Sequence, residues 1–320
     1  MPYAFDPELA PWVELLPALP FDDVVAARAL ESEILTQMPE RELSVPVDVR
    51  DSTAPGPDGA DDVPVRIYTP QIGQAPRSAL VYLHGGGFCL GNVALAHGGC
   101  TLFAAETGAV VVSVEYRLAP EHPFPAGLED GYAALEWTVK HAAELGVDPT
   151  RIGVGGDSAG GGLAAALSLL SRDRGGPVPC FQYLGMPVLD DRLRTPSMHT
   201  FTDTPGLRRC DAESFWDHYL GGPGVRGGAD VSCHAAPARA DDLAALPPAY
   251  VSVCEFDPLR DEALDYAHRL VRAGVPTELH LFPGTFHAST AIQDADVSRR
   301  MTSEAIGAMR RGLRVGAPVE

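Results

Sequence analysis

A serine set between glycines is the residue of this sequence best suited to nucleophilic chemistry. Residues 156–160 read GDSAG and match the pattern G-x-S-x-G. The pattern is typical of a sharp turn between a strand and a helix, which pushes the serine hydroxyl clear of the backbone. A strand-like segment, 151–155, precedes it and a helix-like segment, 160–171, follows it. We therefore predict Ser158 as a nucleophile, the alternative being a glycine-rich turn that only packs a strand on a helix.

A serine nucleophile needs a general base, and this turn fixes the order of its partners along the chain. The carboxylate follows the serine and the histidine comes last. Only His268, His280 and His287 lie late enough. The first falls inside a predicted helix and the second inside a predicted strand, whereas His287 lies on a loop just after the strand 277–282. Because open α/β sheets carry their chemistry on loops that follow the strands, we predict His287 as the base.

The carboxylate that orients the base is predicted at Asp257. It follows the apolar strand 250–253 and precedes Pro258, which ends that strand. Acidic residues at the start of the next helix are already explained by the helix dipole, and an acidic pair after the preceding strand comes one strand too early. These alternatives are Asp261 and Glu262 at the helix, Asp190 and Asp191 after the earlier strand, and the neighbouring Glu255.

Three consecutive glycines, Gly85, Gly86 and Gly87, follow the apolar strand 80–83. In acyl transfer the substrate carbonyl oxygen becomes an anion, and backbone N–H groups aimed at it lower the barrier. Glycines let the main chain turn these groups inward, and the N–H of Ala159 supplies a further donor. The glycines alone are also compatible with a flexible surface turn. The histidine that precedes them is predicted to hold the loop.

Strand-like and helix-like segments alternate along most of the chain, which predicts a parallel sheet with helices on both faces. The segments 45–49 and 63–68 predict an antiparallel hairpin at the edge of this α/β sheet. The other predicted strands are 80–83, 110–114, 151–155, 181–188, 250–253 and 277–282. The predicted helices are 125–145, 160–171, 263–271 and 298–313.

Two regions break this alternation and are predicted to cover the site. Residues 1–44 hold one predicted helix, 22–38, and residues 190–240 hold another, 211–220, that carries three aromatic side chains. So long a gap between strands is uncommon unless it forms a lid or binding loop. The aromatic content favours a lid over an inert insertion. The predicted catalytic core then comprises residues 45–189 and 241–320.

Composition argues against several classes of partner. The 43 acidic and 24 basic residues give a net charge of −19, so no basic surface for nucleic acid or anionic lipid is expected. The N-terminal segment does not have the pattern of a secretory signal, and no run of about 18 apolar residues could insert stably in a membrane. The six cysteines form no C-x-x-C pair and are expected to be reduced. We expect a cytoplasmic protein with no metal site.

Five segments form a specific combination of motifs. They are HGGGF at 84–88, YRLAPEHPFPA at 116–126, GDSAGG at 156–161, DPLRDE at 257–262 and GTFHAS at 284–289. Together they resemble the motifs of the bacterial hormone-sensitive-lipase-like esterases, over the chain from about residue 45 to its C-terminus. The resemblance implies the α/β-hydrolase fold with a helical cap. It also implies hydrolysis of short to medium acyl esters without a cofactor, by proteins that are often homodimers.

Residue by residue, the resemblance implies Ser158 as nucleophile, with Asp257 and His287 completing a triad. It implies Gly86, Gly87 and Ala159 as oxyanion donors, the two cover regions as a cap over the acyl pocket, and YRLAPEHPFPA as a support for the loops around the site. We expect a carboxylic-ester hydrolase that acts on a small-molecule ester through an acyl-enzyme. The alternatives are an amidase, peptidase or carbamate hydrolase with the same triad, or a non-catalytic receptor that uses the same pocket.

Overall fold

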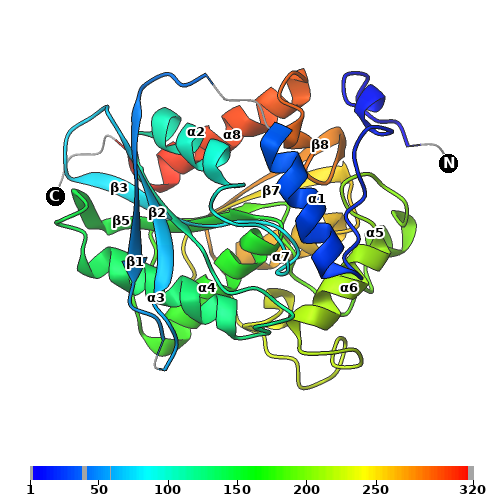
Figure 1. Ribbon diagram of the computed structural model, residues 1–320. Helices are drawn as coiled ribbons and strands as arrows, with labels where there is room; N and C mark the ends of the chain where they lie inside the picture. Colours follow the sequence, from blue (N-terminus) through cyan, green and yellow to red (C-terminus); the bar gives the residue numbers. More distant parts are fainter. Residues whose placement is uncertain (1–2, 38–41, 58, 316–320) are drawn as a thin grey trace.

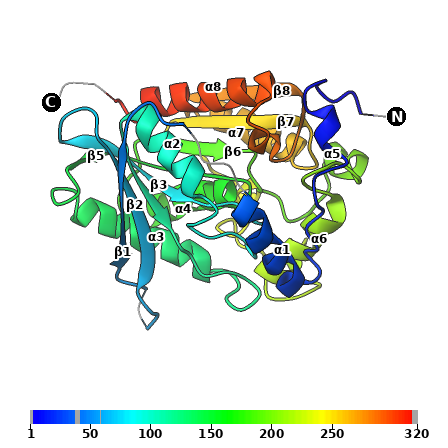
Figure 2. The ribbon, with the colours of Figure 1, turned by 45° about the horizontal axis from the view of Figure 1, so that its top comes forward.

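A mixed sheet forms the centre of the computed structural model, which describes residues 3–37, 42–57 and 59–315 (Figure 1). Its eight strands have the order β1-β2-β4-β3-β5-β6-β7-β8. Helices cover both faces, so the predicted α/β-hydrolase architecture is confirmed (Figure 2). The strands are β1 (Val47–Ala54), β2 (Val63–Pro70), β3 (Arg77–Leu83), β4 (Val110–Val114), β5 (Val147–Asp157), β6 (Gln182–Gly185), β7 (Ala249–Phe256) and β8 (Thr277–Phe286).

The strand directions bring the predicted site residues to one edge of the sheet. β1 and β2 form the predicted antiparallel hairpin at the far edge, and β2 also pairs antiparallel with β4. From β3 to β8 all neighbours are parallel. Because parallel strands end at the same edge, the loops after β3, β5, β7 and β8 lie together there. The segments with Gly85–Gly87, Ser158, Asp257 and His287 are these four loops.

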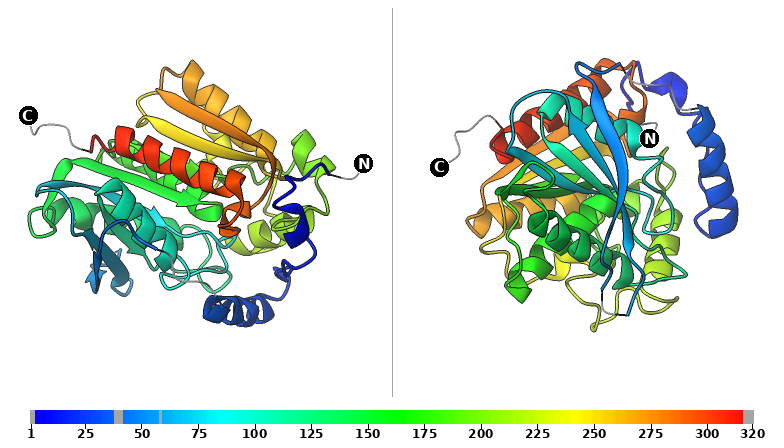
Figure 3. Two further views of the ribbon diagram at one scale, coloured as in Figure 1. Left: turned by 90° about the horizontal axis from the view of Figure 1, so that it is seen from above. Right: turned by 60° about the vertical axis from the view of Figure 1, so that its left-hand side comes forward.

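Each face of the sheet buries its own apolar layer (Figure 3). On one face α2 and α8 pack against large side chains such as Tyr82, Tyr183 and Tyr250. On the other face α3, α4 and α7 cover the aliphatic residues of the same strands. The helices of the two layers are α2 (His97–Thr107) and α8 (Asp296–Gly312), and α3 (Ala126–Lys140), α4 (Ala159–Arg174) and α7 (Arg260–Arg272).

Three remaining helices lie beyond the carboxyl edge, in the regions where a cover is predicted. They are α1 (Val24–Gln37), α5 (Pro196–Thr200) and α6 (Arg209–Tyr219). α1 and α6 lie side by side, and Phe21 before α1 contacts Phe215 of α6. As predicted, the described chain has no strand between residues 190 and 246. The predicted helix 22–38 is found as α1, and its last residue, Met38, lies outside the described residues.

The structure corrects several predicted boundaries. β6 ends at Gly185 rather than 188, because Pro187 has no N–H to continue the ladder. β5 begins at Val147, four residues earlier than predicted, and α3 ends at Lys140 rather than 145. The helix α2 is absent from the prediction, since its sequence HGGCTLFAAET contains residues of low helix propensity. Single turns of 3₁₀ helix occur at Ala10–Trp12, Pro237–Arg239 and Ser289–Ala291.

Candidate active site

The three residues predicted as a triad form one continuous chain of contacts. Nε2 of His287 lies 2.9 Å from Oγ of Ser158, and Nδ1 lies 2.7 Å from Oδ2 of Asp257. Asp257 and His287 are buried, whereas the serine is partly exposed. A second oxygen of the aspartate accepts a hydrogen bond from the N–H of Leu259, which fixes the carboxylate. The arrangement allows the imidazole to accept the serine proton while the carboxylate holds its other nitrogen.

The carboxylates that the sequence left as alternatives to Asp257 are engaged elsewhere. None of them contacts His287 in the described part of the chain. One alternative, Glu262, is fully buried and accepts the N–H of Leu189, and it thereby supports the loop after β6. The other partners are Gly284 N–H for Glu255, Ser197 N–H for Asp261, Arg192 for Asp190 and Arg239 for Asp191.

Ser158 lies in the strained turn that its motif predicts. Its φ of 56° and ψ of −121° are unfavourable for a residue with a side chain. The turn is held because the N–H of Ser158 donates to the carbonyl of Gly185, at 2.7 Å. It is also held by close packing, since a Cβ at Gly160 would lie 1.9 Å from the carbonyl oxygen of Leu83. The start of α4 therefore packs directly against the end of β3.

The glycine loop after β3 presents free backbone donors beside this turn. Among the described hydrogen bonds, none uses the N–H of Gly85, Gly86, Gly87 or Ala159. Gly87 has a φ of 57°, and a Cβ there would lie 2.6 Å from the ring of Phe21. The loop thus follows a path that a larger residue could not take. The free donors and the serine hydroxyl together form a site that could hold a developing anion.

Comparisons with known proteins agree with this geometry. The sequence model of a family described as alpha/beta hydrolase fold matches residues 80–291. This chain belongs to that family. Carboxylesterase NlhH of Mycobacterium tuberculosis is 40% identical over 299 residues, which cover 91% of this chain and 90% of that protein. Ethyl acetate hydrolase of Pseudomonas putida is 34% identical over 251 residues, 76% and 78% of the two chains.

Solved structures of esterases are also similar to this hydrolase. A bacterial heroin esterase superposes with a TM-score of 0.94 at 47% identity, covering 97% of this chain and 98% of that one. The resemblance to hormone-sensitive-lipase-like bacterial esterases, which rested on five short motifs, is therefore confirmed.

His84 holds the glycine loop of this α/β hydrolase from below, as predicted. Its ring stacks on Tyr116 at a centroid distance of 4.2 Å, and its Nδ1 lies 2.7 Å from the carbonyl oxygen of Gly85. Its Nε2 is buried without a partner in the described structure. Burial lowers the pKa of His84 to about 4, although the contact with the Gly85 carbonyl opposes this shift. The ring is therefore neutral at physiological pH.

The low pKa of His84 predicts a loss of stability in acid. The pKa rises from about 4 in the folded protein to its ordinary 6.5 on unfolding, so between these values the unfolded chain binds more protons. Stability due to this residue is complete above pH 6.5 and falls by about 3 kcal/mol as the pH drops to about 4. Urea unfolding of wild type and His84→Asn between about pH 7 and pH 4.5 should show a steeper decline for the wild type. Parallel curves would contradict the prediction.

The segment 116–126 joins the glycine loop to the helices above it. The N–H of Ala119 donates to the carbonyl of Phe88, at the end of the glycine loop, at 3.0 Å. The N–H of Phe124 donates to the carbonyl of the last residue of α6, at 2.7 Å. Arg28 of α1 donates to the carbonyl of Ala119, at 3.1 Å. The motif YRLAPEHPFPA thus contacts the loop and both helices, which agrees with the supporting role implied for it.

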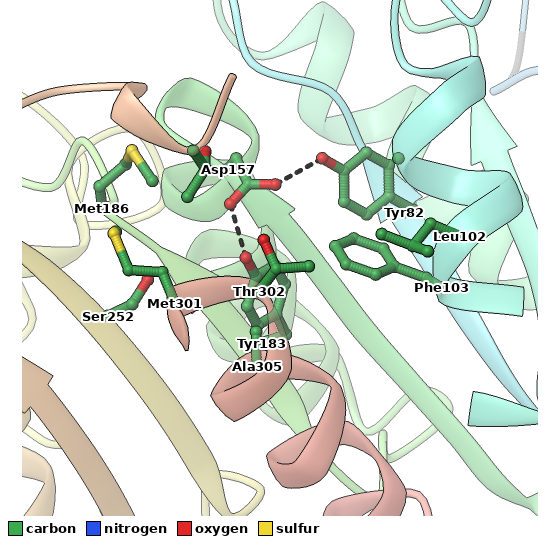
Figure 4. A pocket seen from close by; sticks show the side chains of 12 residues that line it. Tyr82, Leu102, Phe103, Asp157, Tyr183, Met186, Ser252, Met301, Thr302 and Ala305 are labelled. Atoms are coloured by element: carbon green, nitrogen blue, oxygen red, sulfur yellow. Dashed lines mark hydrogen bonds between the residues drawn. The ribbon is translucent and has the colours of Figure 1, made fainter. Parts of the chain in front are cut away.

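Sequence analysis did not single out Asp157, the residue before the serine. Its Oδ2 accepts a hydrogen bond from the hydroxyl of Tyr82 at 2.6 Å, and its Oδ1 accepts one from Tyr183 at 2.7 Å. Figure 4 shows the carboxylate between the two rings, on the face of the sheet that α2 and α8 cover. Both partners come from other strands, so no local sequence signal could have indicated them.

One group of side chains in the described structure has metal-ligand geometry. Glu278, His280 and Glu304, from β8 and α8, bring one ligand atom each to within 4.8 Å of the others. Glu278 is already paired with Arg311 and with His280. None of the three contacts the triad. The group therefore has no part in the chemistry of Ser158, and the triad itself needs no metal ion to function.

Proposed function

We propose that this protein is a serine carboxylesterase that cleaves esters of small carboxylic acids through an acyl-enzyme. The observation that carries the proposal is the continuous contact from Ser158 through His287 to Asp257, at 2.9 and 2.7 Å. The names of its relatives support it, because each describes an esterase or ester hydrolase.

The reaction follows from the order of these contacts. Oγ of Ser158 attacks the ester carbonyl carbon while its proton passes to Nε2 of His287. Asp257 holds the imidazole in the tautomer that can accept this proton. The tetrahedral intermediate collapses, the alcohol leaves with the proton from the imidazole, and the acyl group remains on the serine. Water then attacks the acyl-enzyme by the same route, which releases the acid and restores the serine.

The intermediate's anion is held, in this proposal, by the N–H groups of Gly85, Gly86, Gly87 and Ala159. Two observations support the assignment. These donors have no other acceptor in the described structure, and Ala159 is the first residue of α4, so the positive end of that helix dipole faces the anion. Losing one such donor typically reduces the rate roughly 10²–10³-fold.

We further propose residues 45–189 and 241–320 as the catalytic core, with residues 1–44 and 190–240 as a cap. The cap contacts the site at two places in the described structure. Phe215 of α6 and Phe21 pack over Gly87, and a Cβ at Gly206 would lie 2.1 Å from the carbonyl oxygen of His287. A cover packed this tightly over both sides of the serine favours short to medium acyl groups.

Two finer proposals concern assembly and location. β8 is an edge strand with exposed Leu279 and Leu281, which supports a homodimer formed along this edge. A molar mass in solution of twice 33.9 kDa tests the dimer. All six cysteines are free, which supports a cytoplasmic location that cell fractionation can test. Every helix in the described residues is too short or too polar to span a bilayer.

The proposed function is tested with p-nitrophenyl esters from acetate to palmitate. We expect rapid hydrolysis of the butyrate, a decline toward the long chains, and covalent labelling by a fluorophosphonate. The butyryl anilide of matched acyl length serves as the control for the leaving group, and it should react far more slowly. Faster anilide turnover would favour an amidase. A protein that hydrolyses none of these substrates and stays unlabelled would contradict the proposal and favour a receptor.

A further inference from the structure

The carboxyl group of Asp157 is fixed from two sides by the sheet. Tyr82 of β3 and Tyr183 of β6 both pair in register with Gly155, two residues before Asp157 on β5. Residues two apart in a strand share a face, so both rings lie on the same side as the carboxylate. Their hydroxyl groups reach one oxygen each. The side chain is therefore held between the two strands that flank β5.

The two hydrogen bonds favour the ionised form of this carboxyl group. Distances of 2.6 and 2.7 Å are typical of hydroxyl donors on a carboxylate. Burial raises the pKa of Asp157, while the hydrogen bonds from Tyr82 and Tyr183 and the charge of His287 oppose this rise. The side chain also lines a cavity of about 110 Å³ between α2 and α8, which has room for solvating water. No arginine or lysine in the described structure pairs with it.

The carboxylate is linked to the triad by packing and by charge. Ser158 follows it directly, and the serine N–H donates to Gly185, whose Cα packs against Oδ1 of Asp157. A positive charge on His287 lowers the pKa of Asp157. Because such coupling is reciprocal, a negative charge on Asp157 favours the protonated form of His287. Asp257 is the contact partner of that imidazole, and Asp157 is a second carboxylate behind the serine.

We propose that Asp157 is a positioning residue that stabilises the imidazolium of His287. As Ser158 attacks the ester, its proton moves from Oγ to Nε2, and a positive charge appears on the ring. The carboxylate held by Tyr82 and Tyr183 lowers the free energy of this charged state without touching the reacting atoms. The inference rests on the proposed ester hydrolysis and adds to it a residue that sets the pH range of activity.

The surroundings of Asp157 make this role testable by pH. The groups that face it are Tyr82 from β3, Cys100 from α2, Tyr183 from β6, Tyr250 and Cys254 from β7, and His287 after β8. α8 contributes only the uncharged Met301, Thr302 and Ala305. Burial raises the pKa of the tyrosines and thiols above their ordinary values, so they stay neutral. Histidine is the side chain of this set that ordinarily titrates near neutral pH.

The test measures kcat/KM for p-nitrophenyl butyrate against pH in wild type and Asp157→Asn. Activity needs neutral His287, so the acid limb of the profile reports its protonation. Without the negative charge the imidazolium is less stable, and His287 loses its proton at lower pH. We expect the acid limb to move down by about half a unit to one unit, and the plateau to fall about tenfold. An acid limb at the wild-type pH would overturn the proposal whatever the loss in rate.

Three further variants separate charge from structure. Tyr82→Phe and Tyr183→Phe keep the carboxylate, so their acid limbs should not move down even where the rate falls. Asp265→Asn removes a charge from the exposed face of α7 and should leave rate and limb unchanged. Should Asp157→Asn fold poorly, the double variant with Tyr82→Phe removes the hydroxyl that opposes the new amide. It carries the same charge change, so an unmoved acid limb in this variant also overturns the proposal.

The wild type distinguishes this inference from the proposed function. A wild-type protein that hydrolyses no ester and takes no fluorophosphonate label would remove the esterase function and this inference with it. A wild type that hydrolyses the butyrate, beside an Asp157→Asn variant whose acid limb has not moved, would remove only the role of Asp157.

Discussion

Ser158→Ala should reduce hydrolysis of p-nitrophenyl butyrate by roughly 10⁵–10⁶-fold in kcat, because no other hydroxyl can replace the one that His287 contacts. The change removes only one oxygen from a turn whose backbone is fixed by Gly185 and by the packing of Gly160. The folded state should therefore persist. The rate left over should come from substrate binding and the free N–H donors.

The measurement combines stopped-time hydrolysis with fluorophosphonate labelling and thermal unfolding. Ser158→Ala should stay unlabelled and unfold near the wild-type temperature. Ser168→Ala is the matched control, because Ser168 lies in the same helix and its hydroxyl bonds only the carbonyl of Ala164. That variant should keep nearly full activity. Undiminished turnover by Ser158→Ala would show that the chemistry takes place elsewhere.

Asp257→Asn should lower kcat by about 10⁴-fold, although the side chain keeps its shape. The wild-type carboxylate can only accept a hydrogen bond, so it selects the imidazole tautomer with its proton on Nδ1 and leaves Nε2 free for the serine proton. An amide can donate to Nδ1 instead, which places the ring proton on Nε2, toward Ser158. The amide also lacks the charge that stabilises the imidazolium.

The alternative acid Asp261 supplies the control for this variant. Its carboxylate accepts the N–H of Ser197 at 2.7 Å and does not contact His287 in the described structure. Asp261→Asn should therefore change kcat by less than about threefold, since it alters one partly buried hydrogen bond away from the reacting atoms. If Asp261→Asn lost more activity than Asp257→Asn, the assignment of the orienting carboxylate would be wrong.

The triad could be predicted because each of its members carries a local signal. Ser158 has its glycines and a strand before it, whereas His287 and Asp257 each follow an apolar strand. The parallel order of those strands then brings them to one edge. The edge hairpin was predictable for a similar reason, since its strands alternate apolar and other residues and the structure pairs them in register.

What could not be predicted depends on contacts between distant residues. The helix α2 has weak intrinsic propensity and is stabilised by packing on β4, β2 and α8, which its own sequence does not reveal. The partners of Asp157 are 75 and 26 residues away, on two different strands. Likewise, the hydrogen bond from Arg28 to Ala119 became visible only once the first helix was placed over the core.

The contact between the start of α4 and the end of β3 has a consequence for evolution and for engineering. Main-chain atoms at Gly160 and Leu83 meet directly, with no side chain between them. The separation between the attacking oxygen and the anion-binding loop is therefore a property of the polypeptide itself. Amino-acid replacements in the surrounding layers can reshape the substrate cavity without changing that separation, so specificity can be redesigned while the reaction geometry stays constant.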